Sequence, residues 1–321
     1  MRLVEKSLSK DPNTKSIVPL WCVEGKRHKR MTEPKASKIK KIISTLKEQV
    51  AATPRVTQEL FQTVFKEMGK NPDYVSSFQA PTSLLNQRVS ASRRFAAQSF
   101  ELNRFRKISK ALNVTINDVV LAVCSGALRE YLISQNGLPK KPLIAMVPAS
   151  VRDDSSDMSN RITMILANLG THKENPLDRL DIIIRSVKNA KQRFRRMTSN
   201  QILNYSAFVY GAAGVNMISG MMPKRQAFNI VISNVPGPTE PLYWNGARLD
   251  ALYPASIVLD GQALNITMTS YLDKLEVGLL GCRNALPKMQ NLLTHLEDEI
   301  QRFEAIIELQ NNDKLIEKKQ A

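Results

Sequence analysis

The first ninety residues show helical spacing of apolar positions in two short segments only. Residues 1–35 are basic and interrupted by proline and glycine, which predicts an irregular segment. Residues 36–50 carry apolar side chains at helical spacing with lysines mostly on the other side, and residues 60–68 repeat the apolar spacing. Residues 70–92 are rich in serine, proline and asparagine and are predicted to form a linker.

Two consecutive helices are predicted after Glu101. The second is expected to begin at Thr115, because Thr115 and Asp118 have the spacing of a capping pair that satisfies free amides at a helix start. Its apolar positions continue until Gly137, where the pattern stops. The region from Glu101 to Gly137 is therefore predicted to be helical throughout, apart from one short connection.

The second half of the chain is predicted to be rich in strands. The strands are expected at residues 143–148, 162–169, 228–235, 263–272 and 275–282, with a hairpin turn at Asp273–Lys274 between the last two. A basic helix is expected from Asn175 to about Met197, and an amphipathic helix from about Pro287 ends the pattern. Because helices and strands mix without a regular βαβ repeat, the fold class is predicted to be layered α/β or α+β.

Strict alternation marks the strand at residues 263–272. Leu264, Ile266 and Met268 fall on one face, and the polar residues between them fall on the other. Such alternation is typical of a strand with one exposed face.

Charge is the main compositional signal. The chain of 321 residues is long enough for two domains and has a net charge of +17. Residues 1–50 contain 13 Lys or Arg and 5 Asp or Glu, a net of +8, whereas residues 201–321 contain 10 and 12, a net of −2. The basic part indicates an anionic partner such as a membrane or a phosphorylated small molecule. Nucleic-acid binding is disfavoured because no motif that reads nucleic acid accompanies the charge.

The cysteines and the hydropathy indicate a reducing compartment. Cys22, Cys124 and Cys282 are widely spaced and odd in number, which argues against disulfides and against a cysteine metal site. The N-terminus does not resemble a signal peptide, and no apolar run approaches 18 residues, so no transmembrane span is predicted. The expected location is the cytoplasm.

No catalytic motif can be identified from the residue types and their spacing alone. His28, His172 and His295 have no metal-ligand spacing and read as surface histidines. The sequence contains no nucleophile elbow, Walker loop or dinucleotide fingerprint. The residues alone therefore predict no metal, no cofactor and no enzyme.

Four motifs in order carry a family resemblance. They are NDVVLAVCSGALREYL (117–132), MVPASVR (146–152), ISNVPGP (232–238) and LNITMTSYLDKLEVGL (264–279). Together they resemble the bacterial wax ester synthase/diacylglycerol acyltransferase family of the Acinetobacter type. The resemblance implies a fold of two domains like chloramphenicol acetyltransferase, with the active site between them. Residues 1–138 would be the remainder of the first domain with the linker, 139–310 the second domain, and 311–321 a polar tail.

The family's defining motif, His-His-x-x-x-Asp-Gly, is absent from this sequence. In the family its second histidine is taken as the general base that activates the acceptor hydroxyl. Residues 1–13 resemble the stretch that follows this motif, so the general-base histidine is expected upstream of Met1. The chain alone is therefore expected to be an inactive fragment.

The resemblance implies an O-acyltransferase of neutral-lipid synthesis. Its substrates would be acyl-CoA and either diacylglycerol, giving triacylglycerol, or a long-chain alcohol, giving a wax ester, without a further cofactor. The alternative is a catalytically silent basic protein that binds lipid or membrane surfaces. The sequence does not indicate the oligomeric state.

The resemblance also implies candidate site residues, each with a structural alternative. Those for the substrate cleft or oxyanion support are Asn117, Asp118, Arg152, Asn234, Pro236, Gly237, Asn265, Thr267, Thr269 and Ser270. Asn117 and Asp118 could equally cap a helix, Gly237 could serve a turn that needs a permissive glycine, and Arg152 could be a surface residue. Lys38, Lys40, Lys41 and Lys47 are expected to bind anionic lipid at the inner membrane or at lipid inclusions, or simply to face water.

Overall fold

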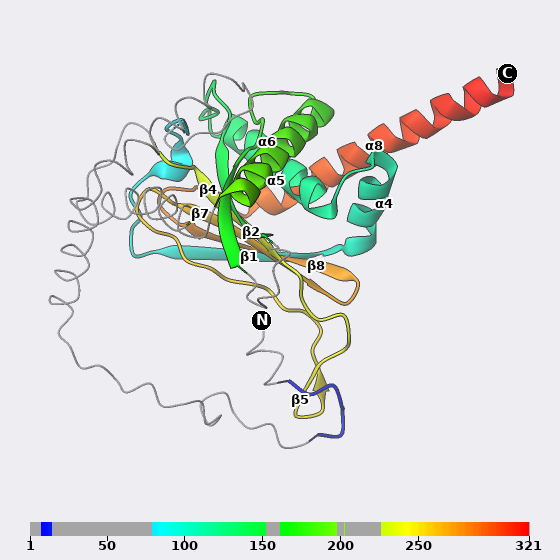
Figure 1. The fold of residues 1–321 in the computed structure, drawn as a ribbon. Coiled ribbons are helices and arrows are strands. Elements are labelled where there is room, and N and C mark those ends of the chain that lie inside the picture. The colour runs from blue at the N-terminus through cyan, green and yellow to red at the C-terminus, as the bar shows by residue number, and fades with distance from the viewer. Residues whose placement is uncertain (1–7, 15–78, 152–160, 198–201, 203–225, 321) are drawn as a thin grey trace. The chain divides into compact units, whose positions relative to one another are not determined.

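The computed structural model describes residues 8–14, 79–151, 161–197, 202 and 226–320 (Figure 1). The two helices predicted at 36–50 and 60–68, with the four candidate lysines, lie outside these residues, and so does Arg152. The predicted helices and the predicted roles of these residues therefore stay predictions.

The chain divides into two compact units. One contains residues 1–74 and 242–247, and the other contains residues 75–241 and 248–321. In the smaller unit, Ser9 and Tyr243 exchange two backbone hydrogen bonds of 2.9 and 2.7 Å. β5 (Tyr243–Trp244) pairs with β6 (Ala247–Arg248) through a turn in which Asn245 and Gly246 both have positive φ.

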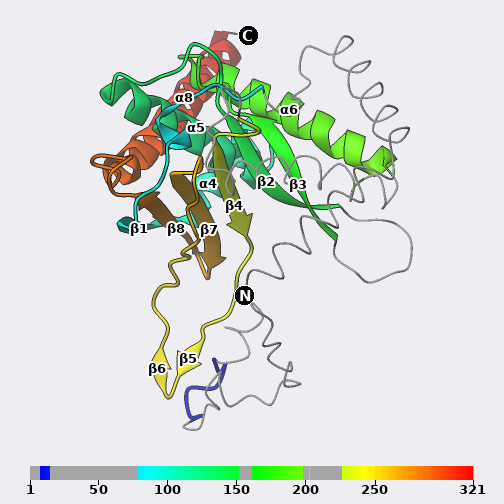
Figure 2. The ribbon, with the colours of Figure 1, turned by 90° about the vertical axis from the view of Figure 1, so that its left-hand side faces the viewer.

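The larger unit is built on one six-stranded mixed sheet with the strand order β1-β8-β7-β4-β2-β3. Its elements are η1 (Leu84–Asn86), β1 (Arg93–Glu101), α4 (Leu102–Leu112), α5 (Ile116–Ser134), β2 (Ile144–Val151), β3 (Arg161–Asn168), α6 (Pro176–Arg196), β4 (Ile230–Val235), β7 (Leu264–Tyr271), β8 (Lys274–Cys282) and α8 (Asn291–Gln320). Figure 2 shows the helices gathered on one side of the sheet. The mixed α/β class predicted from the sequence is confirmed.

Three parallel strands form the middle of the sheet. β4 pairs in parallel with β2 on one side and with β7 on the other. The remaining pairs, β2–β3, β7–β8 and β8–β1, are antiparallel. Because β2, β4 and β7 run in one direction, their carboxyl ends meet at the same edge of the sheet, where open α/β sheets commonly bind ligands.

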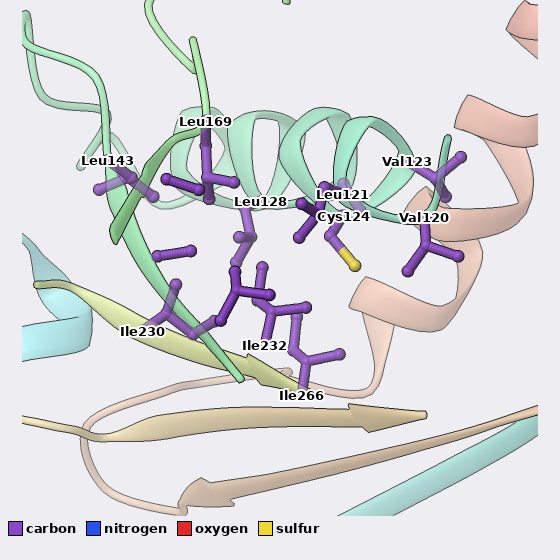
Figure 3. Packing of buried hydrophobic residues seen from close by; sticks show 14 of the residues in the cluster. Val120, Leu121, Val123, Cys124, Leu128, Leu143, Leu169, Ile230, Ile232 and Ile266 are labelled. Atoms are coloured by element: carbon purple, nitrogen blue, oxygen red, sulfur yellow. The ribbon is translucent and has the colours of Figure 1, made fainter. Parts of the chain in front are cut away.

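Helix α5 is the main cover of this sheet. Thr115 caps it by accepting a hydrogen bond from the Asp118 amide, and the Asp118 carboxylate accepts one from the Thr115 amide, so the predicted capping box is confirmed. Most residues of α5 are buried. Leu128 faces Ile230, and the side chain of Cys124 points toward β4 and β7 (Figure 3). The prediction that Cys124 is a buried small apolar residue is confirmed.

A buried ion pair joins α6 to α8 against α5. Arg179 is 1% exposed, donates to the carbonyl groups of Lys173 and Glu174, and pairs with the carboxylate of Glu299. A Cβ atom on Gly126 would lie 2.1 Å from the Glu299 carboxyl carbon, so only glycine lets α5 approach this pair. The three helices are therefore held at one fixed spacing.

The predicted strands and the basic helix are confirmed, with the expected cap of that helix at Asn175. β1 was not predicted. The hairpin turn is formed by Leu272 and Asp273, with Leu272 at a φ of 55°, and not by Asp273 and Lys274. The last helix begins at Asn291 and continues to Gln320 through most of the predicted polar tail. The domain boundary at 138/139 stays a prediction, although α5 and the strands after it share one compact unit.

Among the described residues, no single helix is both long and apolar enough to cross a membrane. α4 and α5 pass that criterion only when taken together, and the two are bent by 105° relative to each other. Most of α5 is buried in the core, as in helices that cover the sheet of a globular domain.

Breaking the Arg179–Glu299 pair is predicted to destabilise the larger unit strongly. Glu299→Gln keeps the shape of the side chain but leaves the buried Arg179 charge without its counter-charge, which should lower the free energy of unfolding by about 3–5 kcal/mol. Asp181→Asn is the matched control, because Asp181 pairs with Arg185 at the surface. It should change stability by about 0.5 kcal/mol or less in urea denaturation. Equal effects of the two substitutions would contradict the role given to the pair.

Candidate functional site

The segment that follows β4 is fixed to the end of β7 by two side-chain hydrogen bonds. The Thr269 hydroxyl donates to the carbonyl of Val235 at 3.0 Å, and the backbone N–H of Gly237 donates to the Ser270 hydroxyl at 3.1 Å. The structure therefore brings Thr269, Ser270 and the Pro236–Gly237 turn together, as the candidate site required. Gly237 is not among the glycines with positive φ, so the prediction that its turn needs a permissive backbone is wrong.

The two faces of the sheet separate the remaining candidates on β4 and β7. Thr267 donates to the Asn265 side-chain oxygen at 2.8 Å, and both lie on the face opposite the helices. Asn234 pairs in register with Met268 and lies on the helix-covered face. The structure therefore does not bring Asn234 together with the Asn265–Thr267 pair.

The polar face of β7 is mostly buried, and only Thr267 on it is half-buried. Asn265 and Thr269 are buried, and so is Tyr271, whose hydroxyl donates to the Leu249 carbonyl at 3.0 Å. The alternation itself is confirmed, but the expectation of a half-exposed strand is wrong, because another segment of the chain covers this face. Buried hydroxyl and amide groups keep fixed directions, which suits them to binding a polar group.

The start of α5 lies at the same edge as the carboxyl ends of β4 and β7. Figure 3 shows Val120, near that start, beyond the Ile232 and Ile266 end of these strands. The two capping oxygens, Thr115 Oγ1 and Asp118 Oδ2, are also hydrogen-bonded to each other, because the Thr115 hydroxyl donates to Asp118 at 2.6 Å. Asp118 thus acts as a cap in this structure, while Asn117 is half-buried beside it.

A buried carboxylate that was not predicted lies next to these groups. Glu276 on β8 is 0% exposed and stands in register between Ser99 on β1 and Thr269 on β7. Its Oε2 atom accepts a hydrogen bond from the Ser99 hydroxyl at 2.5 Å, and the same hydroxyl is 2.9 Å from the hydroxyl of Tyr253. Its Oε1 atom is buried and has no hydrogen-bond partner in the described part of the chain.

The sequence does contain a signal for this residue. Glu276 is the one ionisable residue within the apolar run of residues 275–280. A charged residue in such a strand is uncommon unless it is paired or functional. The other members, Ser99 and Tyr253, lie 177 and 23 residues away from Glu276 and carry no local signal.

Residues 249–262, called the strap below, cross the polar face of the sheet. The carbonyl oxygen of Pro254 lies only 1.8 Å from the position that a Cβ atom on Gly278 would occupy. Gly278 therefore allows the strap to rest directly on β8. At its far end, Asp260 accepts a hydrogen bond from the amide of Val89 at 2.8 Å.

The described histidines do not form a catalytic pair. His172 is exposed at the surface, and partial desolvation of its ring, together with the charges of Lys173 and Arg129, lowers its pKa. His295 lies 3.8 Å from Asp298 on the last helix. Within the described residues neither histidine bonds to a serine, threonine or cysteine, and no group of three His, Cys, Asp or Glu side chains could hold a metal ion.

The two described cysteines have opposite pKa shifts. Burial raises the pKa of the Cys124 thiol to about 12. Burial also opposes ionisation of Cys282, but hydrogen bonds from Ser90 and from the backbone after Cys282 outweigh it and lower that pKa to about 7.

The fold is a mixed α/β domain with polar groups gathered at one edge of its sheet. Comparison with known proteins gives the family. The wax ester synthase/diacylglycerol acyltransferase catalytic domain matches residues 1–120, and the WS/DGAT C-terminal domain matches residues 158–304.

Individual relatives agree with these matches. The O-acyltransferase WSD of Acinetobacter baylyi is 78% identical over 98% of this chain and 69% of its own length. A probable diacylglycerol O-acyltransferase of Mycobacterium tuberculosis is 38% identical over 96% of this chain and 67% of its own length. The solved wax ester synthase/diacylglycerol acyltransferase of Marinobacter aquaeolei has a TM-score of 0.71 and 38% identity, over 96% of this chain and 64% of that one.

This chain belongs to the wax ester synthase/diacylglycerol acyltransferase family, and the resemblance recognised in its four motifs is confirmed. The mixed α/β fold expected from that resemblance is confirmed by the likeness to the Marinobacter aquaeolei structure, while the division into two domains with an active site between them stays a prediction. The chain spans about two thirds of the length of these three relatives.

The cysteine pKa values predict opposite effects of pH on stability. Because the folded pKa of Cys282 lies below its ordinary value of 9.0, this thiol adds stability as pH rises from about 7 to about 9. The folded pKa of Cys124 lies above 9.0, so this thiol removes stability as pH rises above about 9. Cys282→Ala should therefore flatten the rise below pH 9, and Cys124→Ala should flatten the fall above it, in urea unfolding measured across pH. The same change of slope in both variants would contradict the assignment.

Proposed function

We propose that this chain is part of an O-acyltransferase of neutral-lipid synthesis. The reaction transfers an acyl group from acyl-CoA to the hydroxyl of diacylglycerol or of a long-chain alcohol. The observation that carries the proposal is the 78% identity, over nearly the whole chain, to a protein named O-acyltransferase WSD. A catalytically silent lipid-binding protein is the less favoured alternative, because the match includes the family's catalytic domain.

Within that reaction, the described residues suit binding and orientation better than proton transfer. The sequence has no His-His-x-x-x-Asp-Gly motif, and the described histidines have no catalytic partner. The carboxyl edge of β4 and β7 instead offers the Ser270 hydroxyl, which accepts from the Gly237 amide and keeps its own proton to donate, while the Thr269 hydroxyl fixes the segment after β4 by donating to Val235. Such a donor supports a developing negative charge on the thioester oxygen when it is held in place beforehand.

The 321-residue chain alone is predicted to make no wax ester from palmitoyl-CoA and hexadecanol. Loss of a general base costs about 10²–10⁴-fold in rate, and here the motif that surrounds it is absent too. A chimera that places the motif-bearing portion of the Acinetobacter baylyi relative before this chain should restore turnover. The same chimera with the second motif histidine changed to alanine is the matched control and should be inactive.

Two outcomes would contradict the proposal. Turnover by the chain alone, near that of the relative, would show that another residue serves as the base. A folded chimera without turnover would show that this chain lacks the substrate-binding function assigned to it.

We also propose that the enzyme meets its lipid substrates at an anionic surface, at the inner membrane or at lipid inclusions. Residues 36–50 combine apolar positions at helical spacing with Lys38, Lys40, Lys41 and Lys47. A basic amphipathic helix of this kind lies in a membrane interface, and each lysine near the surface contributes about 1 kcal/mol. The proposal rests on the sequence, since these residues lie outside the described part of the structure.

Changing the four lysines to glutamine is predicted to weaken binding to anionic vesicles. Wild-type chain should sediment with such vesicles at about 50 mM salt and be released toward about 300 mM, because salt screens the attraction. A variant with four glutamines on the described basic helix, at Lys188, Lys191, Arg193 and Arg195, removes equal charge and should still bind. Equal sedimentation of wild type and the first variant would contradict the proposal.

A further inference from the structure

Glu276 has an unsatisfied oxygen in the interior of the larger unit. One carboxylate oxygen accepts from Ser99, while Oε1 is buried and has no partner among the described residues. A buried acceptor without a donor destabilises a fold, and a carboxylate does so more than a neutral group. An unsatisfied buried group in a folded protein needs an explanation, and a ligand that supplies the missing donor is one.

The hydroxyl groups beside Glu276 are already used. Thr269, directly opposite on β7, donates to the Val235 carbonyl. Ser99, directly opposite on β1, donates its proton to Oε2, and its oxygen is within hydrogen-bond distance of the Tyr253 hydroxyl. Neither neighbour therefore supplies the hydrogen bond that Oε1 lacks.

The strap is the segment that covers this position. The described hydrogen bonds that hold it lie at its two ends, where the Leu249 carbonyl accepts from Tyr271 of β7 and Asp260 accepts from the Val89 amide, with the Ser99–Tyr253 hydrogen bond between them. In the middle, Tyr253 is 43% exposed and Ile257 is 68% exposed, so both gain little from packing, whereas Val258 is buried. Lifting the middle of the strap breaks the Ser99–Tyr253 bond and leaves every strand pairing of the sheet intact.

We propose that Glu276 is the hydrogen-bond acceptor of a substrate subsite beneath the strap, where its Oε1 atom receives a neutral donor of the bound substrate. This inference rests on the acyltransferase function proposed above. The neutral donors of that reaction's substrates belong to one of two molecules, the acyl acceptor with its hydroxyl or acyl-CoA, whose pantetheine arm offers amide N–H groups. Glu276 holds the substrate and is not assigned a proton-transfer step.

The test measures dissociation constants by titration calorimetry for the 321-residue chain and three variants. Glu276→Met removes the acceptor with little change of volume, and Glu276→Gln retains the polar shape if the methionine variant does not fold. Ser99→Ala is the matched control, because it removes the bond to Oε2 and leaves Oε1 untouched. The ligands are 1-decanol, 1-methoxydecane, which lacks the hydroxyl donor, and CoA.

The two sources of the donor give different results. If the acceptor hydroxyl binds Oε1, wild type and Ser99→Ala prefer decanol over its methyl ether, and Glu276→Met lowers that preference about tenfold. If the pantetheine amide binds there, Glu276→Met instead weakens CoA about tenfold and leaves the preference unchanged. In both cases the midpoint of thermal unfolding of Glu276→Met without ligand equals or exceeds that of wild type.

Other outcomes overturn the inference. If the Glu276 variants bind all three ligands as wild type does, or if they merely melt at a lower temperature with unchanged affinities, Glu276 is a structural residue and the acyltransferase proposal stands. If wild type binds neither decanol nor CoA, the acyltransferase proposal fails and the inference fails with it.

Discussion

The packing of α5 onto the parallel strands β2, β4 and β7 is the contact on which the larger unit depends. The helix is buried on most of its surface, against the sheet on one side and against α6 and α8 on the others. Gly126 lets α8 bring Glu299 close to the helix axis, where Glu299 neutralises Arg179. A helix held this firmly sets where its first turn lies, and that turn sits at the carboxyl edge of the parallel strands.

The sheet then divides the chemistry between its two faces. The face under α5 is apolar and provides most of the hydrophobic core. The opposite face carries Thr269, Glu276 and Ser99 side by side on adjacent strands. Because the strap shields this face from water, each hydrogen bond there is stronger and each missing one is more costly. A face of this kind specifies the orientation of a polar group, which is what an enzyme needs from residues that do not themselves move protons.

Local patterns in the sequence predicted most of the fold. The capping pair at Thr115 and the alternation on β7 each depend on residues close in the chain, and both appear as expected. β1 escaped prediction because it is an edge strand whose sequence, RRFAAQSFE, is largely polar and lacks the apolar alternation of a core strand. The predicted position of the turn between β7 and β8 was also wrong by one residue, because Leu272 adopts a positive φ that its residue type does not suggest.

The candidate site was predictable only in part. Thr269, Ser270 and Gly237 were found through the family motifs, and the structure joins them by hydrogen bonds. Glu276 stands out as the one ionisable residue in an apolar run, but its contact with Ser99 could not be predicted, because the two are 177 residues apart and meet only through the pairing of β1 with β8. Contacts set by strand register between distant segments leave no local trace in a sequence.

Hydrogen exchange with and without ligand tests most directly whether substrates bind at the carboxyl edge and polar face of the sheet. Amide exchange of the 321-residue chain would be measured by mass spectrometry in the absence and presence of CoA with 1-decanol. Binding at this edge should change exchange in the strap, at residues 249–262, and slow exchange of the Val235 and Gly237 amides, with α6 unaffected. Unchanged exchange in both segments, or protection confined to the helix-covered side of the unit, would contradict it.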